Sequence, residues 1–153
     1  MNIQTLSSFH IIGIAIRTTN ENGQATQDIP QLWNRFFTEG LMAQIPGKAD
    51  DCIYCLYTDY EKDHTRPYTT VIGCRVDSLD LVPEGFVGKT IHAGNYTKFT
   101  AKGDMEQGIV YKEWQKIWNT DIDRTFTTDF EVYGEKARDM KHAEVDIFIA
   151  VQS

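Results

Sequence analysis

Residues 125–133, with the sequence TFTTDFEVY, contain the acidic residue of the chain that is hardest to explain by packing. Phe130 and Val132 alternate with Glu131 and Tyr133, which predicts a short strand with the apolar pair on one face and the acid beside the tyrosine on the other. Taken alone, this pattern is typical of a half-buried strand whose glutamate faces water, because most glutamates are exposed. The residues elsewhere in the chain indicate whether Glu131 is an ordinary exposed residue or part of a binding site.

Two segments with helical periodicity carry the aromatic residues that could complete a site around this acid. The first helix is expected to begin with Asp28 as its N-cap and Pro30 in its first turn. The second is expected after a turn at residues 102–104, with Asp104 as its cap. Their apolar faces consist of Ile29, Leu32, Trp33, Phe36 and Phe37 in the first helix, and of Val110, Tyr111, Trp114, Ile117 and Trp118 in the second.

Two helices over the same sheet would bring tryptophan side chains toward the strand that carries Glu131. Aromatic faces attract cations, and a carboxylate below them supplies the opposite charge. Burial would raise the pKa of Glu131 unless a cation or a hydrogen bond from a nearby tyrosine compensated it. We therefore predict a site for a lipophilic cation with Glu131 as the charge anchor. Its candidate walls are Trp33, Phe37, Tyr57, Trp114 and Tyr133.

The strands that must position this site follow from apolar and β-branched runs. They are expected at residues 9–19, 52–60, 68–76, 86–100 (broken by Gly88 and Gly94), 125–133 and 145–151. With the two helices, the order is strand, helix, strand, strand, and then the same unit again. This order predicts an α+β fold in which duplicated modules form an antiparallel sheet with both helices on one face. A groove between the helices is the expected place for a ligand.

Other chemistry finds little support in the sequence. Cys52 and Cys55 form a C-x-x-C pair, but residues three apart in a strand face opposite sides, and the only other cysteine is Cys74. The four histidines show no metal-binding spacing, and no nucleophile motif or phosphate-binding loop is present. We expect no cofactor and no metal.

Composition indicates one soluble domain spanning residues 1–153. Hydrophobic residues make up 41% of the chain and charged residues 24%, as in ordinary globular proteins. The net charge of -7 argues against sequence-independent binding of nucleic acid, which needs a basic face. No signal sequence or membrane span is recognised, and three cysteines without a secretion signal favour a cytoplasmic protein with free thiols.

Several short motifs, in their order and spacing, resemble the GyrI-like small-molecule-binding domain. The motifs are Leu32-Trp33 with Phe36, the segment YTTVIG at 68–73, Gly94-Asn95-Tyr96 with Phe99, and FEVY at 130–133 before the closing strand VDIFI. This domain is the effector-binding domain of bacterial AraC-type and MerR-type multidrug-responsive transcription regulators. The resemblance covers residues 9–151. It implies paired strand-helix-strand-strand modules and an aromatic pocket whose acidic residue is Glu131.

A stand-alone module is expected, because eight residues before Phe9 cannot hold a helix-turn-helix. The first hypothesis is a small-molecule (effector or drug) binding protein for cationic, lipophilic or aromatic compounds, without catalytic residues. The resemblance leaves two alternatives. One is a small-molecule hydrolase that uses Glu131 as base or nucleophile, although the sequence offers no second catalytic group. The other is an inhibitor that binds a DNA-topology enzyme through its acidic surface.

Overall fold

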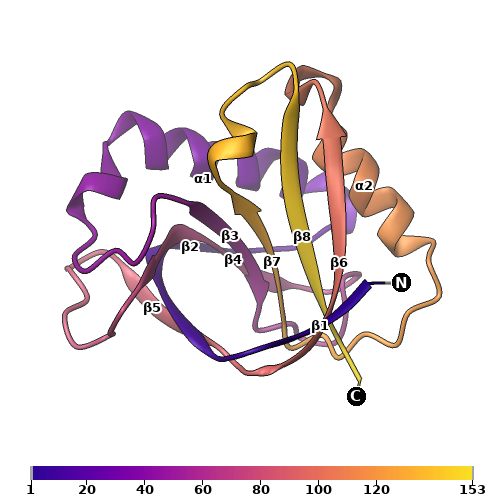
Figure 1. Ribbon diagram of the computed structural model, residues 1–153, viewed down its shortest axis with the longest axis horizontal. Helices are drawn as coiled ribbons and strands as arrows, with labels where there is room; N and C mark the ends of the chain where they lie inside the picture. The colour runs from indigo at the N-terminus through magenta and orange to yellow at the C-terminus, as the bar shows by residue number, and fades with distance from the viewer. Residues whose placement is uncertain (1, 153) are drawn as a thin grey trace.

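A single curled antiparallel sheet of eight strands forms the centre of the computed structural model, which describes residues 2–152 (Figure 1). The strand order across the sheet is β1-β6-β8-β7-β3-β4-β2-β5. The elements are β1 (Asn2–Leu6), β2 (Phe9–Thr18), α1 (Ala25–Thr38), β3 (Ile53–Thr58), β4 (Tyr68–Val76), β5 (Val87–Ile91), β6 (Gly94–Gly103), α2 (Ile109–Trp118), β7 (Thr128–Tyr133) and β8 (Ala143–Val151).

The strand order is symmetric about the central pair β3 and β7. The modules β2-α1-β3-β4 and β6-α2-β7-β8 each follow the predicted order, so the expected duplicated α+β fold is confirmed. Cys55 lies opposite Glu131 in the register of β3 and β7, which puts the acid at the junction of the two modules. Each module also receives a strand from the other, because β1 precedes β2 but pairs with β6, whereas β5 precedes β6 but pairs with β2.

Strand β1 was not predicted from the sequence, and strands β5 and β6 were predicted as one interrupted run. Strand β1 is short and mostly exposed, so its residues carry little of the apolar alternation that reveals a half-buried strand. Strands β5 and β6 are separate, since the chain turns at residues 92–93 and pairs each strand with a different half of the sheet.

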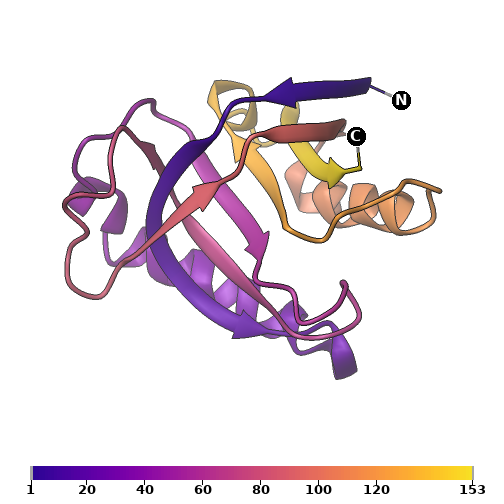
Figure 2. The same cartoon turned by 90° about the horizontal axis from the view of Figure 1, so that it is seen from below.

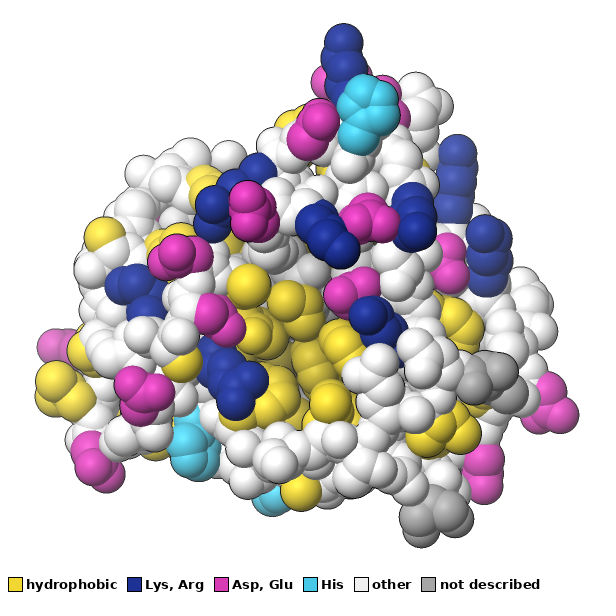
Figure 3. Space-filling model, viewed as in Figure 1, with side chains coloured by type: hydrophobic (Ala, Val, Ile, Leu, Met, Phe, Trp, Pro, Cys, Tyr) yellow, Lys and Arg dark blue, Asp and Glu magenta, His cyan; other side chains and the backbone are white. Residues whose placement is uncertain are grey.

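Both helices cover the same face of the sheet (Figures 1 and 2). Helix α1 packs mainly against β2 and β4, and α2 packs against β6. The opposite face has its own apolar cluster around Phe9, Tyr54 and Phe130. On that face, apolar side chains gather in a hollow bordered by charged residues (Figure 3). The sheet therefore separates two apolar layers. Among the described residues, helices α1 and α2 cover one of these layers, and the layer around Phe9, Tyr54 and Phe130 lies on the other face.

The predicted N-cap of the first helix is wrong. Helix α1 begins at Ala25, and Asp28 lies inside its first turn, where its Oδ2 accepts hydrogen bonds from Thr18 Oγ1 at 2.8 Å and from Gln24 Nε2 at 3.0 Å. Pro30 consequently lies one turn into the helix. Asp104 does act as a cap, but of the short 3-10 turn Met105–Gln107 that precedes α2. No helix within residues 2–152 combines the length and the apolar character that crossing a membrane requires.

Candidate ligand-binding site

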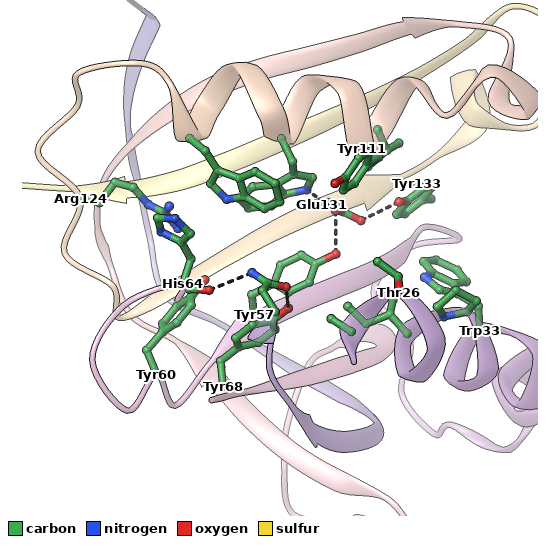
Figure 4. A pocket seen from close by; sticks show the side chains of 17 residues that line it. Thr26, Trp33, Tyr57, Tyr60, His64, Tyr68, Tyr111, Arg124, Glu131 and Tyr133 are labelled. Carbon is green, nitrogen blue, oxygen red and sulfur yellow. Dashed lines mark hydrogen bonds between the residues drawn. The ribbon is translucent and has the colours of Figure 1, made fainter. Parts of the chain in front are cut away.

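A cavity of about 430 Å³ lies between the two helices and the sheet face they cover (Figure 4). Residues from α1, α2, β3, β4 and β7 contribute to it, together with the connections that follow β2, β3 and α2. The lining residues are Asn20, Ala25, Thr26, Ile29, Pro30, Trp33, Tyr57, Tyr60, His64, Tyr68, Val110, Tyr111, Trp114, Trp118, Arg124, Glu131 and Tyr133.

Glu131 is buried at the wall of this cavity, with only 1% of its surface exposed. The alternation of β7 turns Glu131 toward the helices and Phe130 toward the opposite apolar cluster, as the sequence predicted. Its Oε2 accepts hydrogen bonds from Trp114 Nε1 at 2.6 Å and from Tyr57 Oη at 2.8 Å. Its Oε1 accepts one from Tyr133 Oη at 2.6 Å. Strands β3 and β7 and helix α2 therefore each hold the same carboxylate.

Burial raises the pKa of Glu131 above its ordinary value of 4.5. The hydrogen bonds from Tyr133, Trp114 and Tyr57 act in the opposite direction without cancelling the effect of burial. All three donors are uncharged, and no lysine, arginine or histidine among residues 2–152 forms an ion pair with Glu131. The carboxylate is therefore oriented by its neighbours but not neutralised by them.

Aromatic rings pack edge to face around the acid. Tyr57 and Trp114 have centroids 5.2 Å apart with an interplanar angle of 76°. Trp33 and Tyr133 lie 4.8 Å apart at 74°. These pairs join α2 to β3 and α1 to β7, so the aromatic walls also fix the helices over the sheet.

Five of the six predicted site residues meet at the cavity: Glu131, Trp33, Tyr57, Trp114 and Tyr133. The prediction for Phe37 is wrong in placement, since its side chain lies outside the cavity lining and is 60% exposed. It stacks on the outer side of the helix against Trp33, with centroids 5.8 Å apart. The reason is helical geometry: four residues turn about 400°, so Phe37 points about 40° farther from the sheet than Trp33 does.

A second buried acid on the same strand, Asp129, was not predicted from the sequence. Asp129 is 0% exposed and accepts hydrogen bonds from Arg124 Nη2 at 2.7 Å, Tyr60 Oη at 2.6 Å and the backbone NH of Ala150 at 2.9 Å. Arg124 and Tyr60 both line the cavity, as does His64. The alternation of side chains along β7 could have predicted the position of Asp129, because it puts residues 129 and 131 on the same face of the strand.

The C-x-x-C pair has no metal-binding geometry around it. Cys52, Cys55 and Cys74 are all free, and Cys55 is buried with its Sγ 3.5 Å from Tyr57 Oη. Within residues 2–152, no three histidine, cysteine, aspartate or glutamate side chains are grouped so that they could hold a metal ion.

A curled sheet with two helices over one face and a cavity between them is the architecture that the resemblance to the GyrI-like effector-binding domain implies. The family model described as "Cass2: Integron-associated effector binding protein" matches residues 2–151, and the chain belongs to this family. This match confirms the resemblance to GyrI-like effector-binding domains. An integron cassette protein from the mobile metagenome of Vibrio cholerae is 33% identical, with a TM-score of 0.76 over 99% of this chain and 95% of that chain.

One further relative agrees with this assignment, and one further structure shares the fold. YobU of Bacillus subtilis (strain 168), provisionally named as a transcriptional regulator, is 30% identical over 144 residues, which are 92% of this chain and 90% of YobU. The structure of SAV2435 bound to tetraphenylphosphonium has a TM-score of 0.80 over 99% of this chain and 93% of that chain. At 21% identity, this second likeness shows the shared fold.

Proposed function

We propose that this protein binds lipophilic cations in the cavity between α1 and α2, with Glu131 as the charge anchor. The observation that carries the proposal is the state of this carboxylate. It is 1% exposed, held by three uncharged donors, and without an ion-pair partner among residues 2–152.

Burying a charge without compensation is costly. A carboxylate removed from water loses solvation that neutral hydrogen-bond donors restore only in part. A cation that enters the cavity would supply the missing opposite charge. The ring faces of the aromatic walls would add cation–π attraction, which favours cations whose own hydration is weak. A cavity of about 430 Å³ is within the range that takes drug-sized molecules.

The relatives support this choice of ligand class. The family to which the chain belongs is one of effector-binding proteins. The structure of the similarly folded SAV2435 is bound to tetraphenylphosphonium, a bulky cation without hydrogen-bonding groups. We infer that a ligand of this kind is what the aromatic cavity of the present chain accepts.

The geometry favours binding over hydrolysis. Both oxygens of Glu131 already accept hydrogen bonds, one from Tyr133 and the other from Tyr57 and Trp114. A carboxylate has about four lone-pair positions, so these three donors leave a single one, on Oε1. A nucleophile or base would have to direct that one position at the substrate, whereas a charge anchor needs no particular lone pair.

A matched pair of probes tests the role of charge. Benzyltrimethylammonium and neopentylbenzene have the same shape and differ in one positive charge. Calorimetric titration of the wild-type protein should give a dissociation constant at least about tenfold lower for the cation, a difference of about 1.4 kcal/mol. If the uncharged isostere bound as tightly, the cavity would be a general apolar site and the proposal would be wrong.

A further inference from the structure

One end of the cavity contains buried nitrogen atoms that no described residue satisfies. His64 Nδ1, Trp118 Nε1 and both Nε and Nη1 of Arg124 are buried without a hydrogen-bond partner within residues 2–152. All three side chains line the cavity. Figure 4 shows Arg124 and His64 at one end of it and Trp33 at the other, with Glu131 between them. Buried donors are rarely left unpaired in native proteins, so this cluster needs an explanation.

Arg124 is held rigidly in a position that leaves donors free. Its Nη2 lies 2.7 Å from Asp129 Oδ2, and its side chain is only 6% exposed. The guanidinium carbon lies 4.3 Å from the centroid of the Phe126 ring. Hydrogen bonds from Tyr60 and the Ala150 backbone hold Asp129 in place. Its ion pair neutralises the arginine and fixes its orientation. The remaining N–H groups on Nε and Nη1 are then available to a ligand.

His64 and Trp118 stack on each other and are linked to Arg124 by the Phe126 ring, over which the guanidinium lies. Their rings are 5.7 Å apart with an interplanar angle of 11°, and His64 also stacks on Phe126 at 6.1 Å and 24°. Burial, and then the charge of Arg124, lower the pKa of His64, so its ring is neutral near pH 7 and can carry one proton on Nδ1. The backbone carbonyl of His64 accepts a hydrogen bond from Asn20 Nδ2 at 2.8 Å, which holds this loop at the cavity.

We propose that Arg124, His64 and Trp118 form a second subsite, the donor end, which binds a carboxylate or a similar acceptor oxygen of the ligand. The preferred ligands are then amphiphilic molecules that carry a lipophilic cation and, at some distance from it, an anionic or strongly accepting group. This inference rests on the proposed function, because it assigns the cationic part of the ligand to Glu131. The two subsites would orient such a molecule along the cavity.

Two phosphonium probes test the donor end directly. Pentyltriphenylphosphonium and (4-carboxybutyl)triphenylphosphonium share the same cation and differ in whether the alkyl chain ends in a methyl group or a carboxylate. In wild-type protein, calorimetry should show the carboxylate probe binding about tenfold more tightly, as one charged hydrogen-bonding site allows. The net charge of -7 opposes this preference, so the gain would have to arise locally.

Two conservative variants test whether the preference for the carboxylate probe arises at the donor end. His64→Phe and Trp118→Phe keep aromatic rings in place and remove the Nδ1 and Nε1 groups. In each variant the carboxylate preference, taken as the ratio of the two dissociation constants measured in that same variant, should fall to about threefold or less. His142→Phe changes an exposed histidine outside the cavity and should keep the full preference.

The outcomes separate this inference from the proposed function. Equal binding of the two probes by wild type, or a preference that survives in both ring variants, would overturn the donor end and leave the cation site intact. If neither probe showed saturable binding, the proposed function would be wrong, and the donor end with it.

Discussion

The two buried acids of β7 differ in how their charges are compensated. Asp129 is paired with Arg124 at 2.7 Å, whereas Glu131, two residues further along the same face, is held only by Tyr57, Trp114 and Tyr133. An acid that is already neutralised by a neighbouring cation contributes to the fold. An acid that is oriented but not neutralised is suited to a charged ligand.

The raised pKa of Glu131 gives cation binding a defined pH dependence. Below this pKa the carboxyl group is protonated and neutral, and above it the group offers a negative charge. A bound cation favours the ionised form, so the affinity for tetraphenylphosphonium should increase as the pH rises through the pKa, with release of a proton. Calorimetry between about pH 5 and about pH 8, in buffers of different ionisation enthalpy, would measure both effects.

The control for this pH profile is Glu131→Gln, which has no carboxyl group at this position. Its affinity for the same cation should be low and should lack the rise with pH that ionisation of the carboxyl group gives the wild type. A wild-type affinity that does not change with pH, or the same profile in the variant, would show that another group controls binding.

Helix α1 illustrates how an element determines which aromatic residues reach the ligand. Trp33 lines the cavity and packs against Tyr133, while Phe37 is 60% exposed on the outer side of the same helix. Trp33→Leu should therefore weaken tetraphenylphosphonium binding about fivefold, since a cation–π contact and apolar area are lost. Phe37→Leu should change the affinity less than about twofold.

Both variants can be compared by calorimetry, which does not depend on tryptophan fluorescence. Equal losses in the two would place the ligand on the outside of α1 rather than in the cavity. A loss confined to Phe37→Leu would contradict the assigned walls.

A close approach between β2 and β4 supports the sheet beneath α1. Gly13 and Gly73 lie opposite each other in this pair, and a Cβ on Gly73 would overlap the Ile12 carbonyl and come within 2.6 Å of Gly13 Cα. Gly73→Ala should lower the free energy of unfolding by about 3 kcal/mol, because backbone atoms cannot move aside cheaply. Urea unfolding is the appropriate measurement.

Gly94→Ala is the matched control for this substitution. A Cβ at Gly94 would meet no atom within 4 Å, and its backbone conformation is accessible to alanine. Its effect should stay within about 1 kcal/mol. If Gly73→Ala were equally mild, the close approach of the two strands would not limit the stability of the sheet.

At the scale of the whole molecule, periodicity and element order predicted most of the architecture. The duplicated modules, both helices on one face, and Glu131 facing the helices all followed from local alternation and helical spacing. The exchange of β1 and β5 between modules did not, because pairing between distant strands leaves no local pattern. Arg124 and His64 were also missed, since they lie in irregular connections whose path depends on tertiary contacts.

A test of Glu131 as the charge anchor needs a control variant with the same change in net charge. Glu131→Gln and Glu144→Gln each remove one negative charge from a protein of net charge -7. Glu144 lies on β8 outside the cavity and pairs with Lys102 and Lys136. The two variants therefore change the long-range attraction for a cation equally. Only the first removes the buried charge.

Titration of tetraphenylphosphonium into wild type and these two variants at pH 8 is the most direct test. We expect Glu131→Gln to weaken binding about tenfold or more, which corresponds to about 1.4 kcal/mol, and Glu144→Gln to change it less than about twofold. Equal affinity in wild type and Glu131→Gln, with saturable binding in both, would contradict the role of Glu131 as the charge anchor.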